Sequence, residues 1–234
     1  MSINNFIGIK NEVIRNLEIP KELNGYIIIK KIIEQYSSVV LLAEEIGKEL
    51  VAIKFVPYQN YQKDKEGYDI KEKVKGENCS NIIKINKFFL YPTEKPKFAA
   101  FIMPFMPTDL LEYLNSVGPI QEKRVKIIMK QLFDTVHKLH SQNILHCNLK
   151  LENILLDTQS FSIKLTGFRL AKSIQNEAIC AQGNGTLDYS APELLFISDD
   201  FLRFKDEAIC MYFFFLRKMK IKIQLSIQKF EWSY

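Results

Sequence analysis

The stretch that decides the fold is HCNLKLENILL, residues 146–156. Its pattern, H-x-N-L-K-x-x-N, places two amides and a lysine in a short polar loop that ends in an apolar run. Two other short patterns accompany it, VAIK at 51–54 and GTLDYSAPE at 185–193, and a helical pattern precedes it. Each pattern alone is weak evidence, but their order along one chain argues against a chance match.

The bulk composition is that of a folded globular protein. The chain has 234 residues, of which 47% are apolar and 25% charged, enough for one large domain or two modest lobes. Its net charge of +5 comes from interspersed Lys and acidic residues, so no basic patch supports nucleic-acid binding. The 4 scattered cysteines form no C-x-x-C pair and are expected to be reduced thiols.

No targeting or membrane segment is predicted. The N-terminus, MSINNFIGIK, lacks the basic region and continuous apolar core of a signal peptide. The longest apolar run, Ala208–Leu216, is well short of the roughly 20 residues that span a bilayer. We therefore expect neither secretion nor binding to a membrane, and cytoplasmic localisation is the default.

The N-terminal part is predicted to be an antiparallel sheet, followed along the chain by a short helix within the polar segment 58–78. On the strand VAIKFV, the two-residue period puts Ala52, Lys54 and Val56 on one face. A solvent-facing side chain is the simplest explanation of Lys54, and a cation held over a cleft is the alternative that the other motifs favour. Apolar, β-branched runs separated by turn residues predict strands at 25–33, 37–43, 49–56, 82–90 and 97–103.

After Pro107 the pattern becomes helical. The change falls near Pro104–Thr108, and a cleft between a strand-rich lobe and a helical lobe is a common place for a small ligand. In residues 121–140 the apolar side chains repeat at helical spacing and predict one buried stripe: Val125, Ile128, Leu132, Val136 and Leu139.

Taken together, these motifs resemble those of the eukaryotic protein kinases of the Ser/Thr type. The resemblance runs from about Tyr26 to about Glu193. It implies an α+β fold of two lobes, with an antiparallel β-sheet N-lobe and a mainly helical C-lobe that is incomplete at its C-terminal end. We therefore divide the chain into an N-terminal extension, a kinase-like N-lobe, a partial C-lobe and an atypical tail: residues 1–25, 26–103, 104–209 and 210–234.

The resemblance also implies a role for each matching residue. Lys54 would contact the α- and β-phosphates of ATP, Lys150 would neutralise the transferred phosphoryl group, and Asn153 would hold Mg2+. The lysine in the loop and the GT before APE imply Ser/Thr specificity. The adenine would be enclosed by apolar residues: Val40 and Ala52 above it, Leu155 below it, Met103 as the gatekeeper and Met106 at the end of the hinge.

Two departures remove the chemistry of the family. The position of the general base holds Asn148, whose carboxamide neither accepts the proton nor carries a charge. A positioned base is commonly worth ~10²- to 10⁴-fold in rate. The metal-binding Asp of the Asp-Phe-Gly motif is replaced in KLTGFRLA by Gly167, which has no side-chain ligand for Mg2+.

The glycine-rich loop of the family is lost as well. Ile33, Gln35 and Ser38 occupy the positions of its three glycines, and Cβ atoms there obstruct the approach of backbone N–H groups to phosphates. ATP is therefore a doubtful ligand, and so is Mg2+. The acidic partner that Lys54 has in the family is left open among Glu66, Asp69 and Glu72.

Several other conspicuous residues are expected to be structural. The resemblance implies that His146 and Phe168 pack in the core and support the loop. His137 and His140 are expected to be a surface residue and a helix-end residue rather than a pair of metal ligands.

We therefore predict a pseudokinase, a kinase-like module with little or no phosphotransfer that acts as a binding or allosteric partner. Two alternatives stay open: a weakly active kinase that transfers the γ-phosphate of ATP to Ser/Thr hydroxyls, and a decayed, truncated gene product without a stable fold. From about residue 210 onward, including the strand-like IKIQLSI, we expect a premature end or a misread exon rather than kinase-domain sequence. The sequence indicates no particular substrate, partner or pathway.

Overall fold

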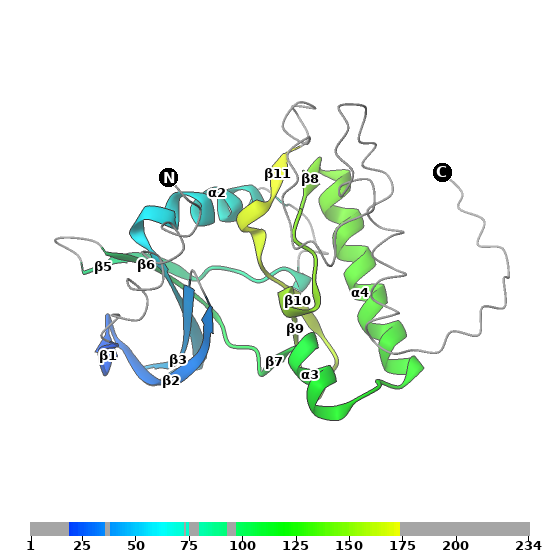
Figure 1. The fold of residues 1–234 in the computed structure, drawn as a ribbon, viewed down its shortest axis with the longest axis horizontal. Coiled ribbons are helices and arrows are strands. Elements are labelled where there is room, and N and C mark those ends of the chain that lie inside the picture. The colour runs from blue at the N-terminus through cyan, green and yellow to red at the C-terminus, as the bar shows by residue number, and fades with distance from the viewer. Residues whose placement is uncertain (1–18, 36–37, 73, 75–79, 93–96, 174–234) are drawn as a thin grey trace, which may run out of the picture.

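The fold, obtained as a computed structural model, combines an antiparallel sheet with a helical part (Figure 1). The structure describes residues 19–35, 38–72, 74, 80–92 and 97–173. The predicted motif GTLDYSAPE and the tail from residue 210 lie outside the described residues.

The sheet has six strands in the order β1-β2-β3-β4-β6-β5, and all neighbours are antiparallel. Four of the five predicted strands are confirmed within a few residues, as β2, β3, β4 and β6. The bounds are β1 Glu22–Leu23, β2 Tyr26–Gln35, β3 Ser38–Glu45, β4 Leu50–Pro57, β5 Lys87–Tyr91 and β6 Phe98–Pro104.

The predicted strand at 82–90 is wrong in its first half. Strand β5 begins only at Lys87, because the backbone at Ile82 and Ile83 pairs with Leu165 of the helical part instead of joining the sheet. Ile82 is buried in the helical part, and Ile83 is buried in the cluster that contains Ala52 and Tyr68. Ile82 makes an isolated bridge with Leu165, and the backbone N–H of Ile83 donates to the carbonyl of Leu165 at 2.9 Å. This segment therefore ties the sheet to the helical part.

Strand β4 has two different buried faces, as its alternation predicts. Val51, Ile53 and Phe55 pack in one apolar cluster inside the curved sheet. Ala52 and Val56 pack in another, together with Tyr68 of helix α2 (Tyr61–Glu72), which follows the short helix η1 (Tyr58–Asn60). The helix expected within 58–78 is thus present and covers the face of β4 that carries Lys54.

The helical part surrounds a second core. All five residues of the predicted stripe on α4 are buried in it. Asp109 caps α3, and its carboxylate accepts the backbone N–H of Glu112 at 2.9 Å. Short strands complete it, in the sheets β10-β9-β7 and β11-β8. The bounds are β7 Thr108–Asp109, α3 Leu110–Val117, α4 Glu122–Ser141, β8 Ile144–Leu145, η3 Leu151–Asn153, β9 Ile154–Leu156, β10 Ile163–Leu165, η4 Phe168–Leu170 and β11 Lys172–Ser173. No helix within the described ranges has the length and apolar character needed to cross a membrane.

Candidate functional site

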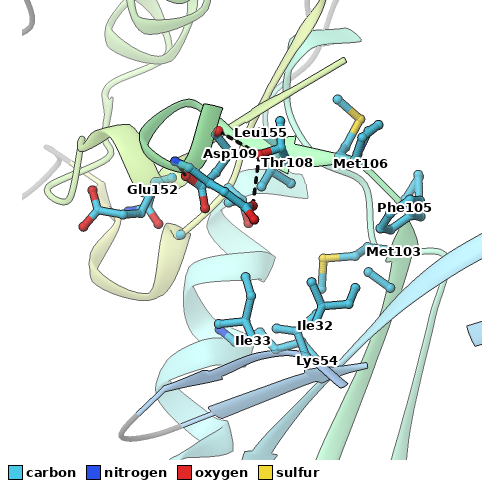
Figure 2. Close-up of a pocket in the computed structure, with 18 of the residues that line it drawn as sticks. Ile32, Ile33, Lys54, Met103, Phe105, Met106, Thr108, Asp109, Glu152 and Leu155 are labelled. Carbon is cyan, nitrogen blue, oxygen red and sulfur yellow. Dashed lines mark hydrogen bonds between the residues drawn. The ribbon is translucent and has the colours of Figure 1, made fainter. Parts of the chain in front are cut away.

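A pocket lies between the sheet and the helical part and is lined by residues of both (Figure 2). Two of the ten residues predicted for the site, Asn148 and Lys150, are not in the pocket lining but lie in the adjoining loop. There the carbonyl of Asn148 accepts a hydrogen bond from Asn153. Sequence motifs that are far apart therefore meet at one place. Eight of the ten residues predicted for the site line the pocket: Val40, Ala52, Lys54, Met103, Met106, Asn153, Leu155 and Gly167.

The middle of the pocket is an apolar slot. Val40 pairs with Lys54 across β3 and β4, and Ala52 pairs with Met103 across β4 and β6, so these side chains come from adjacent strands. Leu155 of β9 packs against the same cluster from the helical part. A flat aromatic ring such as adenine fits a slot of this kind, because both of its faces would contact apolar side chains.

The mouth of the pocket is acidic. Asp109, Glu112 and Glu152 line it, and Figure 2 shows Asp109 and Glu152 on the side of the pocket opposite Lys54. Burial raises the pKa of the Asp109 carboxyl, although its hydrogen bonds from the first turn of α3 act the other way. Sequence reasoning missed these carboxylates, which only the fold brings together.

Lys54 is paired with Asp64, which was not among the three predicted partners. Its Nζ donates to Asp64 Oδ1 at 2.8 Å, and the Asp64 side chain is only 2% exposed. The earlier candidates fail because α2 turns Asp64 and Gly67 inward and Glu66, Asp69 and Glu72 outward. Asp69 instead pairs with Lys65 at the surface.

Arg169 approaches the same carboxylate from η4, with its Nε 3.5 Å from Asp64 Oδ2. One buried carboxylate thus joins β4, α2 and η4. Burial lowers the pKa of the Lys54 ammonium, but Tyr68 and Asp64 outweigh this effect and the pKa is raised overall. Lys54 is therefore charged at neutral pH.

His146 supports the loop rather than acting as a base, as predicted. Its Nε2 lies 2.8 Å from the carbonyl of Thr166, and its Nδ1 accepts the backbone N–H of Asn148 at 3.2 Å. These partners assign the proton to Nε2, because a carbonyl only accepts and an N–H only donates. The ring also packs against Phe168 with centroids 4.6 Å apart, and burial lowers the pKa of His146 to about 4.

Asn153 occupies the space beside Gly167, the position where the resemblance implies a metal-binding Asp. Gly167 has φ = +85°, and a Cβ built on it would lie 2.5 Å from Cγ of Asn153. Asn153 in turn is held by its Nδ2, which donates to the carbonyl of Asn148 at 2.6 Å. The Asn153 carboxamide therefore lies in space that a side chain at 167 would need.

The residues present do not fit Mg2+. At this end of the pocket the carboxamide oxygen of Asn153 is the one side-chain ligand that the motif retains, and hard cations prefer carboxylates and several oxygens. Within the part of the chain that the structure describes, no group of three or more His, Cys, Asp or Glu residues could hold a metal ion. Ile33 and Ser38 also line the pocket, at positions where glycines would leave backbone groups open to phosphates.

Comparisons with known proteins agree on one family. A family model described as "Protein kinase domain" matches residues 33–205. The meiosis-specific serine/threonine-protein kinase mek1 of Schizosaccharomyces pombe is 39% identical over 119 residues, which are 49% of this chain and 26% of that protein. The serine/threonine-protein kinase SRK2J of Arabidopsis thaliana is 32% identical over 163 residues, 66% of this chain and 44% of that protein. The chain therefore spans less than half the length of these two relatives.

A solved structure has a similar fold. The crystal structure of the PF14_0431 kinase domain aligns with a TM-score of 0.70 at 20% identity, covering 86% of this chain and 66% of that one. At this identity the likeness shows the fold alone.

Proposed function

The chain belongs to the eukaryotic protein kinase family, and we propose that within it the chain is a pseudokinase of the Ser/Thr type. Such a module keeps the fold and the pocket but has little or no phosphotransfer. Its use would be to bind or allosterically regulate a protein partner.

The observation that carries this proposal is the joint loss of the base at position 148 and of the metal ligand at position 167, two positions that both adjoin Asn153. Asn148 cannot accept the proton of a substrate hydroxyl, which removes a contribution of ~10²- to 10⁴-fold. Gly167 supplies no metal ligand, and Asn153 occupies the adjacent space. The Asn153 side chain donates a hydrogen bond to the carbonyl of Asn148, so the loop has a defined internal contact at these two positions.

The groups that remain suit binding better than catalysis. In the family, ATP supplies the γ-phosphoryl group. Here the apolar slot would hold the adenine of ATP, and Lys54 would face the phosphates. Lys54 is held by Asp64, and Lys150 lies 3.6 Å from Glu152. Both cations can orient an anion, but neither can deprotonate an alcohol, because a lysine ammonium group donates hydrogen bonds and has no lone pair to accept a proton.

A phosphate-transfer assay separates this proposal from a weakly active kinase. Radiolabelled ATP is incubated with wild type, Lys54→Met and Lys65→Met, with autophosphorylation and a Ser/Thr peptide library as acceptors. Lys65 is the matched control, since its ion pair with Asp69 is at the surface. We expect all three proteins to give background transfer. Transfer by wild type and Lys65→Met that is lost in Lys54→Met would establish a kinase and overturn the proposal.

The alternative of a decayed product without a stable fold is tested by calorimetry. The two cores and the ties between the sheet and the helical part predict one cooperative unfolding transition. A chain that shows no heat-absorption peak, and whose circular dichroism changes gradually with temperature, would support decay.

A further inference from the structure

The two edges of the six-stranded sheet differ in how they are protected. At one edge, β2 is partly covered by β1, and the backbone N–H of Ile28 also donates to the carbonyl of Lys21 at 2.9 Å. Further along, the pairing of β2 with β3 shifts register twice, around Ile29 and around Ile32. Bulges and short covering strands are devices that keep a sheet edge from pairing with another chain.

Strand β5, at the other edge, has neither device among the described residues. The sheet ends at β5, and its five residues pair with β6 in one unbroken register. Its sequence is KFFLY, which holds no proline and only one charged residue, at its start. An apolar, regular edge strand of this kind can be extended by an added strand from another chain.

The backbone of β5 directs hydrogen-bonding groups outward at two residues. The carbonyl of Tyr91 faces β6, because it accepts the N–H of Lys97 at 3.0 Å. Since the backbone groups of successive residues point to alternate sides of a strand, those of Phe88 and Leu90 point away from β6. Their side chains add apolar surface, as Phe88 is 41% exposed and Leu90 is half-buried. The edge therefore offers backbone donors, backbone acceptors and apolar contact.

The charges along this edge are positive. The described residues between 80 and 104 contain no Asp or Glu. Lys87 pairs with Glu45 of β3 at 3.0 Å, whereas Lys84 and Lys97 are exposed and form no ion pair with a described residue. Lys84 precedes the strand and Lys97 adjoins its last residue, so an unpaired cation lies near each end of β5.

These charges decide between two occupants of the edge. If a second copy of the chain paired its own β5 with this one, the lysines of both copies would come together, and like charges on neighbouring strands are destabilising. A segment with carboxylates at its ends would instead meet Lys84 and Lys97. Apolar side chains in the middle of that segment would cover Phe88 and Leu90.

We infer that the edge of β5 binds an extended segment of a protein partner as an added strand, a segment with apolar residues in its middle and acidic residues at its ends. The inference rests on the proposed function, in which the chain binds a protein partner. It adds the surface that binds and the kind of segment that fits, and it does not involve the pocket.

The binding of defined peptides tests the inference. The probe is a blocked, fluorescein-labelled peptide of sequence EEVTVEE, and its affinity for the full chain is measured by fluorescence anisotropy. One control is KKVTVKK, which reverses the charge. The other is EEVTVEE with N-methyl groups on its three central residues, which then lack the N–H donors that an added strand needs. We expect EEVTVEE to bind at least about tenfold more tightly than either control.

Charge-reversal variants test the cations at the two ends. Lys84→Glu/Lys97→Glu should weaken the binding of EEVTVEE by about tenfold, because two exposed attractions become repulsions. The matched control is Lys126→Glu/Lys130→Glu, which changes the net charge equally on the exposed side of α4 and should leave the affinity unchanged. If circular dichroism shows that the first variant does not fold, the N-methylated peptide with wild type decides the matter.

Hydrogen exchange measured by NMR locates the bound peptide. The amide protons of Phe88 and Leu90 should exchange more slowly when EEVTVEE is bound. Four results would overturn the inference: no binding of EEVTVEE, equal binding of EEVTVEE and either control, protection elsewhere without protection in β5, or a dimer of the free chain that already protects these two amides.

These outcomes are separate from those of the radiolabel assay. Phosphate transfer would overturn the pseudokinase proposal and leave peptide binding to be decided by anisotropy. Failure of the peptide would remove the β5 edge as a docking surface and leave the loss of phosphotransfer untouched.

Discussion

Gly67 provides the sharpest structural test, because it marks the contact between α2 and η4 that brings Asp64 to Arg169. A Cβ built on Gly67 would lie 2.0 Å from the carbonyl oxygen of Phe168, 2.6 Å from its carbonyl carbon and 3.0 Å from Cα of Arg169. All three are backbone atoms, so no side-chain rotation relieves the contact. The substitution Gly67→Ala must push α2 and η4 apart.

The size of the effect follows from two opposing contributions, of which the packing cost lies in the upper part of its range because only backbone atoms can give way. Replacing Gly by Ala inside a helix normally stabilises by about 0.5–1 kcal/mol. Forcing extra volume into a packed site costs about 1–3 kcal/mol, and here the gap must open by about 1 Å to bring the 2.0 Å contact to 3.0 Å. We expect a net loss of about 1–2 kcal/mol, which lowers Tm by roughly 2–8 °C in a chain of this size.

The assay is urea unfolding followed by circular dichroism, with wild type, Gly67→Ala and Glu66→Ala compared at one pH. Glu66 is the adjacent exposed position on α2, where Ala should change the free energy of unfolding by no more than about 0.5 kcal/mol. A Gly67→Ala protein more stable than wild type would mean that the higher helix propensity of Ala acts without an opposing packing cost. That result would refute the close packing of α2 on η4.

Three further predictions concern the pH dependence, the loop and the core. Because burial lowers the pKa of His146 to about 4, the unfolded chain takes up a proton near 6.5 while the folded chain does not. In a His140→Gln background, stability should therefore be full above pH 6.5 and fall by about 3 kcal/mol as pH decreases to 4, and a flat profile in urea titrations would contradict the buried neutral ring. Gly167→Asp should destabilise the fold by about 1–2 kcal/mol, because φ is positive at 167 and a side chain there would collide with Asn153. Combined with Asn153→Ala, the cost should be smaller than the sum of the two single changes. Additive values in a double-mutant cycle would rule out the collision. Leu132→Ala should cost about 2–5 kcal/mol, since Leu132 is fully buried on α4, and a loss below 1 kcal/mol in calorimetry would mean that the second core is not packed as described.

Periodicity made the helix α4 and the strand β4 predictable. In both, the spacing of apolar residues encodes which side faces a core, and the structure buries the expected side chains on each. The convergence of the motifs on one pocket was predictable for a different reason. It follows from the resemblance, because nothing in the local sequence brings Lys54 close to Asn153.

The partner of Lys54 could not be predicted from α2 alone. This helix is mostly polar, and its few apolar residues form no periodic stripe that says which of the four carboxylates turns inward. The inward face is fixed by Gly67, which lets Phe168 approach from a distant part of the chain. The contact between Asp64 and Arg169 depends on the same approach. The pairing of Ile82 and Ile83 with Leu165, which shortens β5, is likewise a contact between distant parts of the chain.

The central claim is that this kinase fold has lost phosphotransfer because its base and its metal ligand are both missing. The most direct measurement is the transfer of radiolabelled phosphate by wild type and by the double variant Asn148→Asp/Gly167→Asp, at saturating ATP and Mg2+. We predict background transfer by wild type. Transfer by wild type above background, abolished by Lys54→Met and not raised in the double variant, would contradict the account.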